Sequence, residues 1–280
     1  MRLLVLNRTL YPQSGSEVSR TTLDKSSFAG IAIALGGILV GLVLEGGKIG
    51  QLVQPTAFLI VFGGTLGAVM LQFPLRVIRI AFHHLGTIFY DPSKDPQVLI
   101  AEITEYARKA RKDGIVSLDA GLQEIQDAFL KKCLMLAVDG TEPQEIRSML
   151  ELELDNQEAH DQNVPRVFES AGGFAPTIGI IGAILGLIQV MQHLDDINAV
   201  GRGIAVAFVA TIYGVGAANL FFLPVAGKIK DRIRQEQTRH AMMLEGVISI
   251  LEGMNPRMIE AKLAGFFSQA NANAAKKITK

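Results

Sequence analysis

The stretch AGGFAPTIGIIGAILGLIQVMQ, residues 171–192, decides the fold class of this chain. It has no charged side chain over a length that suits a helix crossing the apolar layer of a bilayer, for which roughly 20 residues suffice. It also contains Pro176 and five glycines, which the interior of a water-soluble helix disfavours. The stretch therefore predicts a transmembrane helix whose composition serves close packing.

Three more charge-free stretches accompany it, at residues 26–44, 49–75 and 203–227. Hydrophobic residues make up 49% of the 280 residues, and the mean hydropathy is +0.31. Four buried helices of a soluble protein would carry polar positions at helical spacing, which all four stretches lack. We predict an all-α membrane protein with four transmembrane helices in two hairpins.

Cations flank the predicted spans unevenly. The two short hairpin connections carry only Lys48 and Arg202, whereas the other flanks carry Arg76, Arg79, Arg166, Lys228, Lys230, Arg232 and Arg234. The positive-inside rule then places both termini and the middle segment in the cytoplasm. The predicted divisions are a polar N-terminal extension (1–27), transmembrane hairpin 1 (28–75), a cytoplasmic helical domain (76–170), transmembrane hairpin 2 (171–227), and cytoplasmic C-terminal helices with a polar tail (228–280).

The middle segment is predicted to be helical. One helix ends at Asp113-Gly114, and the spacing of its apolar residues predicts a second from about Ser117 to Asp139. A third starts with Pro143 in its first turn, and Pro165 must break or kink it. After the fourth span, Gly253 predicts a stop, and Asn255 caps a restart.

The sequence has no enzyme signature. Five histidines are scattered without metal-ligand spacing, and the segment GGFAPTIG lacks the lysine of a phosphate loop. Equal numbers of acidic and basic residues give no case for nucleic-acid binding. Cys133, the only cysteine, is expected to be a small apolar helix residue. We predict no catalytic residue, no metal site and no cofactor.

Small residues form a stripe on each helix of the second hairpin. In the third span they are Gly179, Gly182, Ala183 and Gly186; in the fourth they are Ala207, Ala210, Thr211, Gly214, Ala217 and Ala218. Such stripes let transmembrane helices approach closely. Two interpretations stay open: packing within one chain, or a small face that lines a central space shared by an oligomer.

The absence of intramembrane charge is equally informative. Ion-conducting proteins usually place a carboxylate within the membrane, but these spans offer only hydroxyls and amides, on Thr177, Gln189, Thr211, Tyr213 and Asn219. If the chain forms an ion path, the titrating carboxylate must come from a partner's helix.

The layout and four local segments resemble the MotA-type flagellar stator subunit of the MotA/TolQ/ExbB proton-channel family. The segments are FAPTIGIIGAILGLI, AVAFVATIYGVGAANLFFLPVAGKI, LAVDG and EGMNPRMIEAKL. The last discriminates most, because TolQ and ExbB relatives lack it. The resemblance extends over about residues 28–267.

The resemblance implies an inner-membrane assembly of five such chains around two copies of a MotB-type single-span subunit, whose aspartate carries the ion. Ion flux would turn the ring, and the cytoplasmic helices would push on the rotor protein FliG. The family's two functional prolines correspond to Pro176 and Pro224, and its charged rotor-facing positions to Arg111 and Asp119. Asp119 departs from the usual glutamate. The neighbours of Arg111 in the run RKARK (108–112), Lys112 among them, can share its role.

The predicted ion pathway comprises Pro176, Thr177, Ala183, Ala210, Thr211, Tyr213 and Pro224. Sodium-driven relatives usually carry threonine at Ala183 and a threonine pair at Ala210-Thr211, so fewer hydroxyl ligands favour protons here. The alternatives are a sodium-driven stator, a TolQ/ExbB-type energiser of an outer-membrane process, and a membrane scaffold that conducts nothing.

Overall fold

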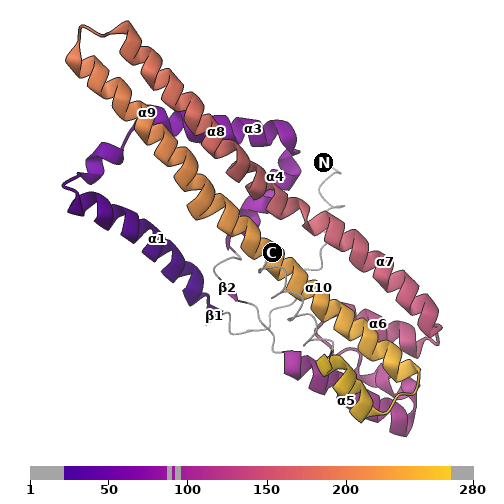
Figure 1. Ribbon diagram of the computed structural model, residues 1–280. Coiled ribbons are helices and arrows are strands. Elements are labelled where there is room, and N and C mark those ends of the chain that lie inside the picture. Colours follow the sequence, from indigo (N-terminus) through magenta and orange to yellow (C-terminus); the bar gives the residue numbers. More distant parts are fainter. Residues whose placement is uncertain (1–21, 87–89, 92–95, 266–280) are drawn as a thin grey trace, which may run out of the picture.

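The computed structural model describes residues 22–86, 90–91 and 96–265, and they form an elongated helical molecule (Figure 1). The only strands among them are β1 (Thr22–Leu23) and β2 (Tyr90–Asp91), which pair antiparallel. Most of the predicted N-terminal extension and the predicted tail from Ala270 lie outside the described residues. Four helical segments are long and apolar enough to cross a membrane, which confirms the predicted number of spans.

The first hairpin begins with α1 (Lys25–Leu44), whose start is capped by the Asp24 carboxylate through the backbone N–H of Ser26 at 3.0 Å. Lys228 pairs with this carboxylate and donates to the Ser27 hydroxyl. Within one chain, no residue of Ser26–Leu44 is buried. In the single chain, the sides of α1 are therefore exposed along the whole span.

The second span is shorter than predicted. The apolar helix starts at Pro55 rather than at residue 49, because η1 (Ile49–Leu52) is a separate 3₁₀ turn and Pro55 opens the new helix. The span then runs through α2 (Pro55–Phe58), the π-helical turn η2 (Leu59–Gly63) and α3 (Gly64–Gln72), and α4 (Leu75–His84) follows it.

The second hairpin and its continuation contain the longest helices of the described residues. Its helices are α8 (Asn163–Gln192) and α9 (Ile197–Ala217), and α9 continues through the π-helical turn η5 (Ala218–Phe222) into α10 (Leu223–Leu251). The predicted interruption near Pro165 is present: α7 (Pro143–Asp161) ends and α8 begins within the turn before it. Pro165 thus lies in a first turn, where its missing N–H costs no hydrogen bond.

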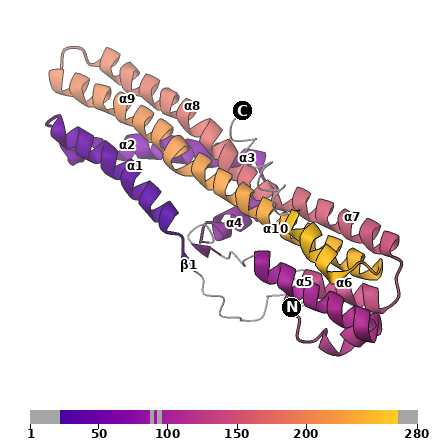
Figure 2. The same ribbon diagram turned by 60° about the horizontal axis from the view of Figure 1, so that its bottom comes forward.

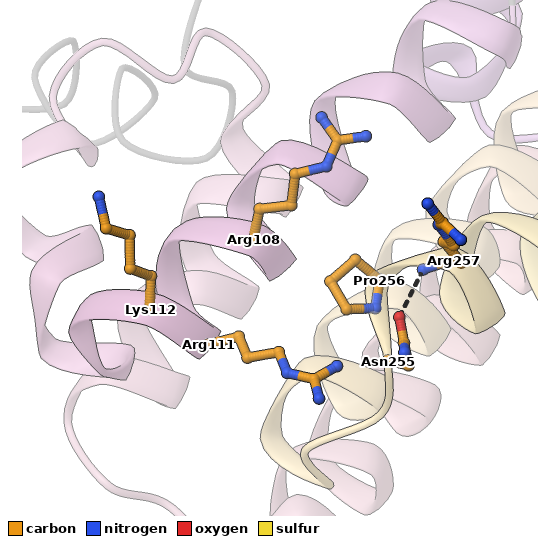
Figure 3. Close-up of a pocket in the computed structure, with 6 residues that line it drawn as sticks. All are labelled: Arg108, Arg111, Lys112, Asn255, Pro256 and Arg257. Carbon is orange, nitrogen blue, oxygen red and sulfur yellow. Dashed lines mark hydrogen bonds between the residues drawn. The ribbon is translucent and has the colours of Figure 1, made fainter.

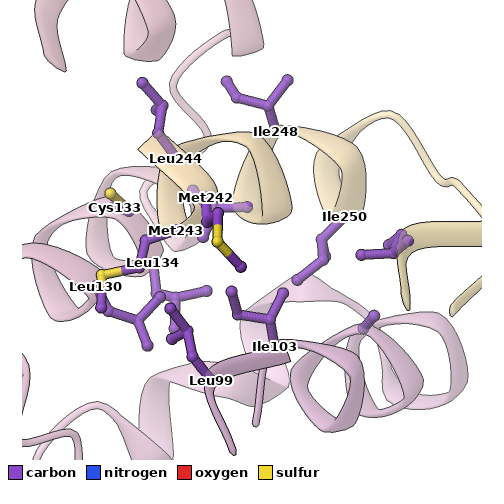
Figure 4. Packing of buried hydrophobic residues seen from close by; sticks show 14 of the residues in the cluster. Leu99, Ile103, Leu130, Cys133, Leu134, Met242, Met243, Leu244, Ile248 and Ile250 are labelled. Carbon is purple, nitrogen blue, oxygen red and sulfur yellow. The ribbon is translucent and has the colours of Figure 1, made fainter. Parts of the chain in front are cut away.

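A helical domain lies at the opposite end from the tip of the α8–α9 hairpin (Figures 1 and 2). This membrane-distal domain contains α5 (Pro96–Asp113), η4 (Ile115–Gly121), α6 (Ala128–Val138), α7, the second half of α10 and a last helix over residues 256–265. Its core is built from buried side chains of all these elements, among them Ile103, Leu134, Met242 and Ile248 (Figure 4). Gly114 (φ 86°) and Gly253 (φ 71°) end α5 and α10, as glycines with positive φ commonly do.

The single helix predicted over residues 117–139 is wrong. Leu118, Leu122 and Ile125 are buried, but they lie in η4 and the loop after it. Helix α6 starts only at Ala128, because the Asp127 carboxylate caps it at the backbone N–H of Phe129 (3.0 Å) and pairs with Arg239 of α10 at 2.6 Å. An apolar spacing that fits one helix was therefore produced by two elements packed on the same core.

Candidate functional site

Helices α8 and α9 meet backbone against backbone. A Cβ added at Gly214 would lie 2.5 Å from the Ala175 carbonyl oxygen, and one at Gly179 would lie 2.9 Å from the Ala210 carbonyl oxygen. The same addition at Gly186 would come within 2.7 Å of the Gly203 carbonyl oxygen. Since Cβ atoms do not approach other atoms this closely, only glycine permits the observed spacing of the two helices.

The glycine stripes are therefore covered within one chain. Gly179, Gly182, Gly186 and Gly214 are all buried between the helices of their own hairpin. This arrangement agrees with the first of the two interpretations, in which the small residues pack within one chain. These four glycines do not present a free face to a shared central space.

Pro176 lies inside α8, which continues through it. A proline lacks the N–H that would bond to the carbonyl four residues earlier, here that of Gly172. The neighbouring Thr177 is exposed in the single chain, and its hydroxyl donates to the Phe174 carbonyl at 2.8 Å. The helix is thus weakened at one level of the membrane-spanning part.

Two π-helical turns pack against α8 on either side of this level. In η2, Ile60 lies beside Gly182, six residues after Pro176. The side chain of Phe222 in η5 lies beside Gly172, just before it. Turn η5 also leads into Pro224, the second residue of α10. At its end the backbone N–H of Leu223 donates to the Ala218 carbonyl. Three helix irregularities therefore lie along about 15 Å of α8, between Gly172 and Gly182, and π-helical turns are frequent at functional sites.

The other predicted pathway residues lie along the same hairpin. Ala210 is completely buried against Gly182, and Ala183 is half-buried. The Thr211 hydroxyl donates to the Ala207 carbonyl at 3.1 Å. The Tyr213 hydroxyl donates to the Leu52 carbonyl and accepts from the Gln54 N–H at 3.3 Å, so it ties the fourth span to the start of the second. Their roles toward an ion stay predictions.

A basic groove lies on the membrane-distal domain, with a volume of about 350 Å³ (Figure 3). We define it by its lining residues, Arg108, Arg111, Lys112, Asn255, Pro256 and Arg257. Figure 3 shows Arg111 directed toward the turn that carries Asn255 and Pro256, and Lys112 directed away from it. The Asn255 side chain is engaged in capping, because it accepts from the Arg257 N–H at 3.1 Å.

Arg111 and Lys112 thus belong to one surface, whereas Asp119 does not line it. Asp119 is exposed on η4, the element after α5. Arg108 belongs to the run RKARK (108–112), whose cations were expected to share the role of Arg111. Arg257 was missed as a candidate, because a single sequence does not show that it folds onto α5.

An ion-pair network fixes the helix that carries Arg257. The Glu245 carboxylate of α10 accepts from Arg147 at 2.8 Å and pairs with Lys262 of the last helix. Burial by itself would raise the pKa of Glu245, but the hydrogen bonds from Lys262 and Arg147 lower it below the ordinary carboxyl value. The carboxylate is therefore ionised at neutral pH and joins α7, α10 and the last helix.

The described part of the chain holds no group of three or more His, Cys, Asp or Glu side chains that could bind a metal. Cys133 is completely buried in the core of the membrane-distal domain.

Comparison with known families gives two matches that together span most of the chain. Residues 28–114 match the motility protein A N-terminal family, and residues 122–242 match the MotA/TolQ/ExbB proton channel family. The chain is 37% identical to motility protein A of Bacillus subtilis (strain 168) over 243 residues, which cover 86% of this chain and 90% of that protein. It is 33% identical to the chemotaxis protein PomA of Vibrio alginolyticus over 248 residues, with coverage of 88% and 96%.

The chain is also similar in structure to solved complexes of this family. The C. jejuni MotAB structure superposes with a TM-score of 0.82 at 32% identity, covering 87% of this chain and 96% of the matched chain. The flagellar MotAB stator complex of Bacillus subtilis gives a TM-score of 0.80 at 36% identity, with coverage of 86% and 96%. These similarities confirm the predicted fold class.

Proposed function

Because this chain belongs to the MotA/TolQ/ExbB proton channel family and is a flagellar stator subunit, we propose that it couples proton flow to torque on the rotor. The observation that carries the proposal is that none of the four predicted spans contains Asp, Glu, Lys, Arg or His. A proton path lined by such uncharged helices needs a titrating group from another chain.

That group is proposed to be the aspartate of a MotB-type single-span subunit. The solved structures that this chain resembles are MotAB complexes. Five copies of this chain would surround two such partners in the inner membrane, with both termini in the cytoplasm. The open flanks of α1 support contacts with lipid and neighbouring copies, since Ile33 is 75% exposed in the single chain.

Protons rather than sodium ions are proposed as the coupling ion. Ala183 and Ala210 offer no oxygen from their side chains, so the Thr211 hydroxyl is the only side-chain oxygen at these three positions. A dehydrated sodium ion needs several oxygen ligands, whereas a proton needs a carboxylate and water. The rotor contact is proposed to involve FliG and the exposed charges of Arg111, Lys112 and Asp119.

The experiment that tests coupling is rotation of cells whose only stator contains this chain and its partner. Withdrawing sodium while the proton gradient is kept should leave rotation unchanged, and rotation that stops would contradict proton coupling. Pro176→Ala should strongly reduce rotation even when the variant protein is present in the membrane in the normal amount. Gly173→Ala is the matched control, because a Cβ at Gly173 meets open space on the same helix.

The remaining candidate functions are less well supported. A TolQ/ExbB-type energiser is not favoured, because the similar curated proteins are named for motility and chemotaxis. A passive scaffold predicts that Pro176→Ala changes assembly but not ion flow. Proton flux measured in vesicles that contain the complex separates that outcome from the proposed one.

A further inference from the structure

We infer that helix α4 binds the headgroups of anionic phospholipids of the cytoplasmic leaflet through Arg76 and Arg79. This helix belongs neither to the predicted ion pathway nor to the basic groove. The positive-inside rule explains why cations occur near it, but assigns them no ligand. The inference goes beyond the proposed function and does not depend on which ion the complex conducts.

Helix α4 begins directly beside the second span. The span ends with α3 at Gln72, the next two residues have extended backbones, and α4 starts at Leu75. The chain changes direction between the two helices (Figure 1). Arg76 and Arg79 follow the end of the span by no more than about two helical turns, so they lie beside the headgroup layer rather than in the hydrocarbon or in bulk water.

The side chains of α4 divide into two faces. Ile78 and Ala81 are buried in a cluster that they share with residues of α8 and α10. The opposite side carries Arg76, Arg79 and His83, which are exposed and follow one another at spacings of three and four residues. These spacings place the three side chains in one stripe. Since the buried face fixes the helix, it also fixes the direction in which the stripe points.

Two exposed apolar side chains border the stripe. Leu75 and Phe82 are each 55% exposed, and they lie one helical turn before and after Arg79. The Phe82 ring also contacts the Phe168 ring of α8, with 6.4 Å between the centroids. Apolar side chains beside a row of cations are typical of a helix that lies in the membrane interface, with the former among acyl chains and the latter at headgroups. A small soluble anion would leave Leu75 and Phe82 in water.

The charge of this surface is not compensated within the chain. No Asp or Glu occurs between Glu45 and Asp91. Within the described residues, no salt bridge joins Arg76 or Arg79 to a carboxylate of any element. Lys228, which also follows a span, is by contrast paired. Guanidinium groups donate paired hydrogen bonds to phosphate oxygens, and the cytoplasmic leaflet supplies anionic phosphate groups at this depth.

The first test is thermal unfolding of the purified complex, full chain with its single-span partner, in nanodiscs of phosphatidylcholine alone or of an equal mixture with phosphatidylglycerol. Wild type should unfold at a higher temperature in the mixture. Arg76→Gln combined with Arg79→Gln should abolish this difference. The unfolding temperature in phosphatidylcholine alone should stay unchanged, because both side chains are exposed. A merely structural role would lower both temperatures equally.

The second test is the affinity of the detergent-solubilised complex for phosphatidylglycerol, measured by native mass spectrometry. A cation near an anionic membrane surface contributes about 1 kcal/mol, or about fivefold in affinity, so the double glutamine variant should bind about 25-fold more weakly. Arg76→Lys combined with Arg79→Lys should retain most of the affinity, because both charges remain. Added salt should narrow the gap between wild type and the glutamine variant.

The matched control is Lys131→Gln, compared with Arg79→Gln alone. Lys131 is a partly exposed cation of α6 in the membrane-distal domain, and it donates to Gln123 at 3.1 Å. Its removal changes the net charge of the chain as Arg79→Gln does. Phosphatidylglycerol binding should stay unchanged, because a charge many ångströms from the headgroups is screened by salt.

Three results would overturn the inference. A double glutamine variant that keeps the preference for phosphatidylglycerol would place the lipid site elsewhere. Equal affinity of wild type for phosphatidylcholine would show that the contact does not recognise anionic charge. Efficient disulfide cross-linking of Arg79→Cys between two copies would show that protein covers this face. Each result would leave the proposed function standing, since the ion dependence of rotation is measured separately.

Discussion

Gly214→Ala should be among the most damaging single-methyl changes in the membrane-spanning part of this protein. The added Cβ would lie 2.5 Å from the Ala175 carbonyl oxygen, the residue directly before Pro176, and 3.1 Å from the Gly179 Cα. Both contacts are backbone atoms of a packed helix, so neither can move away as a flexible side chain could.

The magnitude follows from the geometry. Relief of the clash requires α8 and α9 to separate by several tenths of an ångström along their contact, and overpacking of this kind typically costs about 1–3 kcal/mol. Alanine also favours the helix by up to ~1 kcal/mol relative to glycine, which offsets part of that cost. We expect a net loss of about 1–2 kcal/mol in the free energy of unfolding.

The assay is thermal unfolding of the detergent-solubilised complex followed by far-UV circular dichroism, with motility of the same strains as the functional readout. Gly216→Ala serves as the control. Gly216 lies on the same helix as Gly214, but a Cβ added there has no neighbour within 4 Å in the single chain. Gly216→Ala should be neutral or slightly stabilising. Equal stability of the two variants would refute the conclusion that glycine is required for the close approach of α8 and α9.

Three further predictions concern polar and buried groups. Tyr213→Phe removes the hydroxyl that ties the fourth span to the start of the second, and should cost about 1–2 kcal/mol in thermal unfolding; an unchanged unfolding temperature would show that the tie contributes nothing. Glu245→Gln should cost about 2 kcal/mol at pH 7, discounted because Arg147 and Lys262 are each about one third exposed. The lowered pKa of Glu245 makes its contribution complete above the ordinary value of 4.5 and lost as the pH falls below it, so the two proteins should converge in acid. Burial raises the pKa of Cys133 to about 12, so a maleimide should label the native protein negligibly at pH 7.5 and fully after denaturation; rapid native labelling would contradict the buried position.

Hydropathy and capping chemistry were enough to predict much of this fold. The four spans follow from long charge-free stretches, because a lipid environment leaves few alternatives to a helix. Pro143 and Asn255 marked helix starts correctly, since each acts through backbone groups close to it in sequence. Such local signals are readable from one chain.

Tertiary relations were not readable. The break between η4 and α6 depends on Asp127 pairing with Arg239, which is distant in sequence, and apolar spacing alone did not reveal it. The same limit hid Arg257, whose place beside Arg111 requires α10 and the last helix to fold back onto α5. The small-residue stripes were recognised, but only the structure shows that the two stripes face each other.

The unbroken course of α9, η5 and α10 makes a lever of the fourth span. Ile197–Leu251 is one helical segment of 55 residues, about 80 Å long at 1.5 Å per residue. If α10 tilted by about 10° where η5 meets Pro224, its far end would move sideways by roughly 7 Å over its 29 residues. A small change of angle in the membrane-spanning part would thereby be enlarged at the membrane-distal domain.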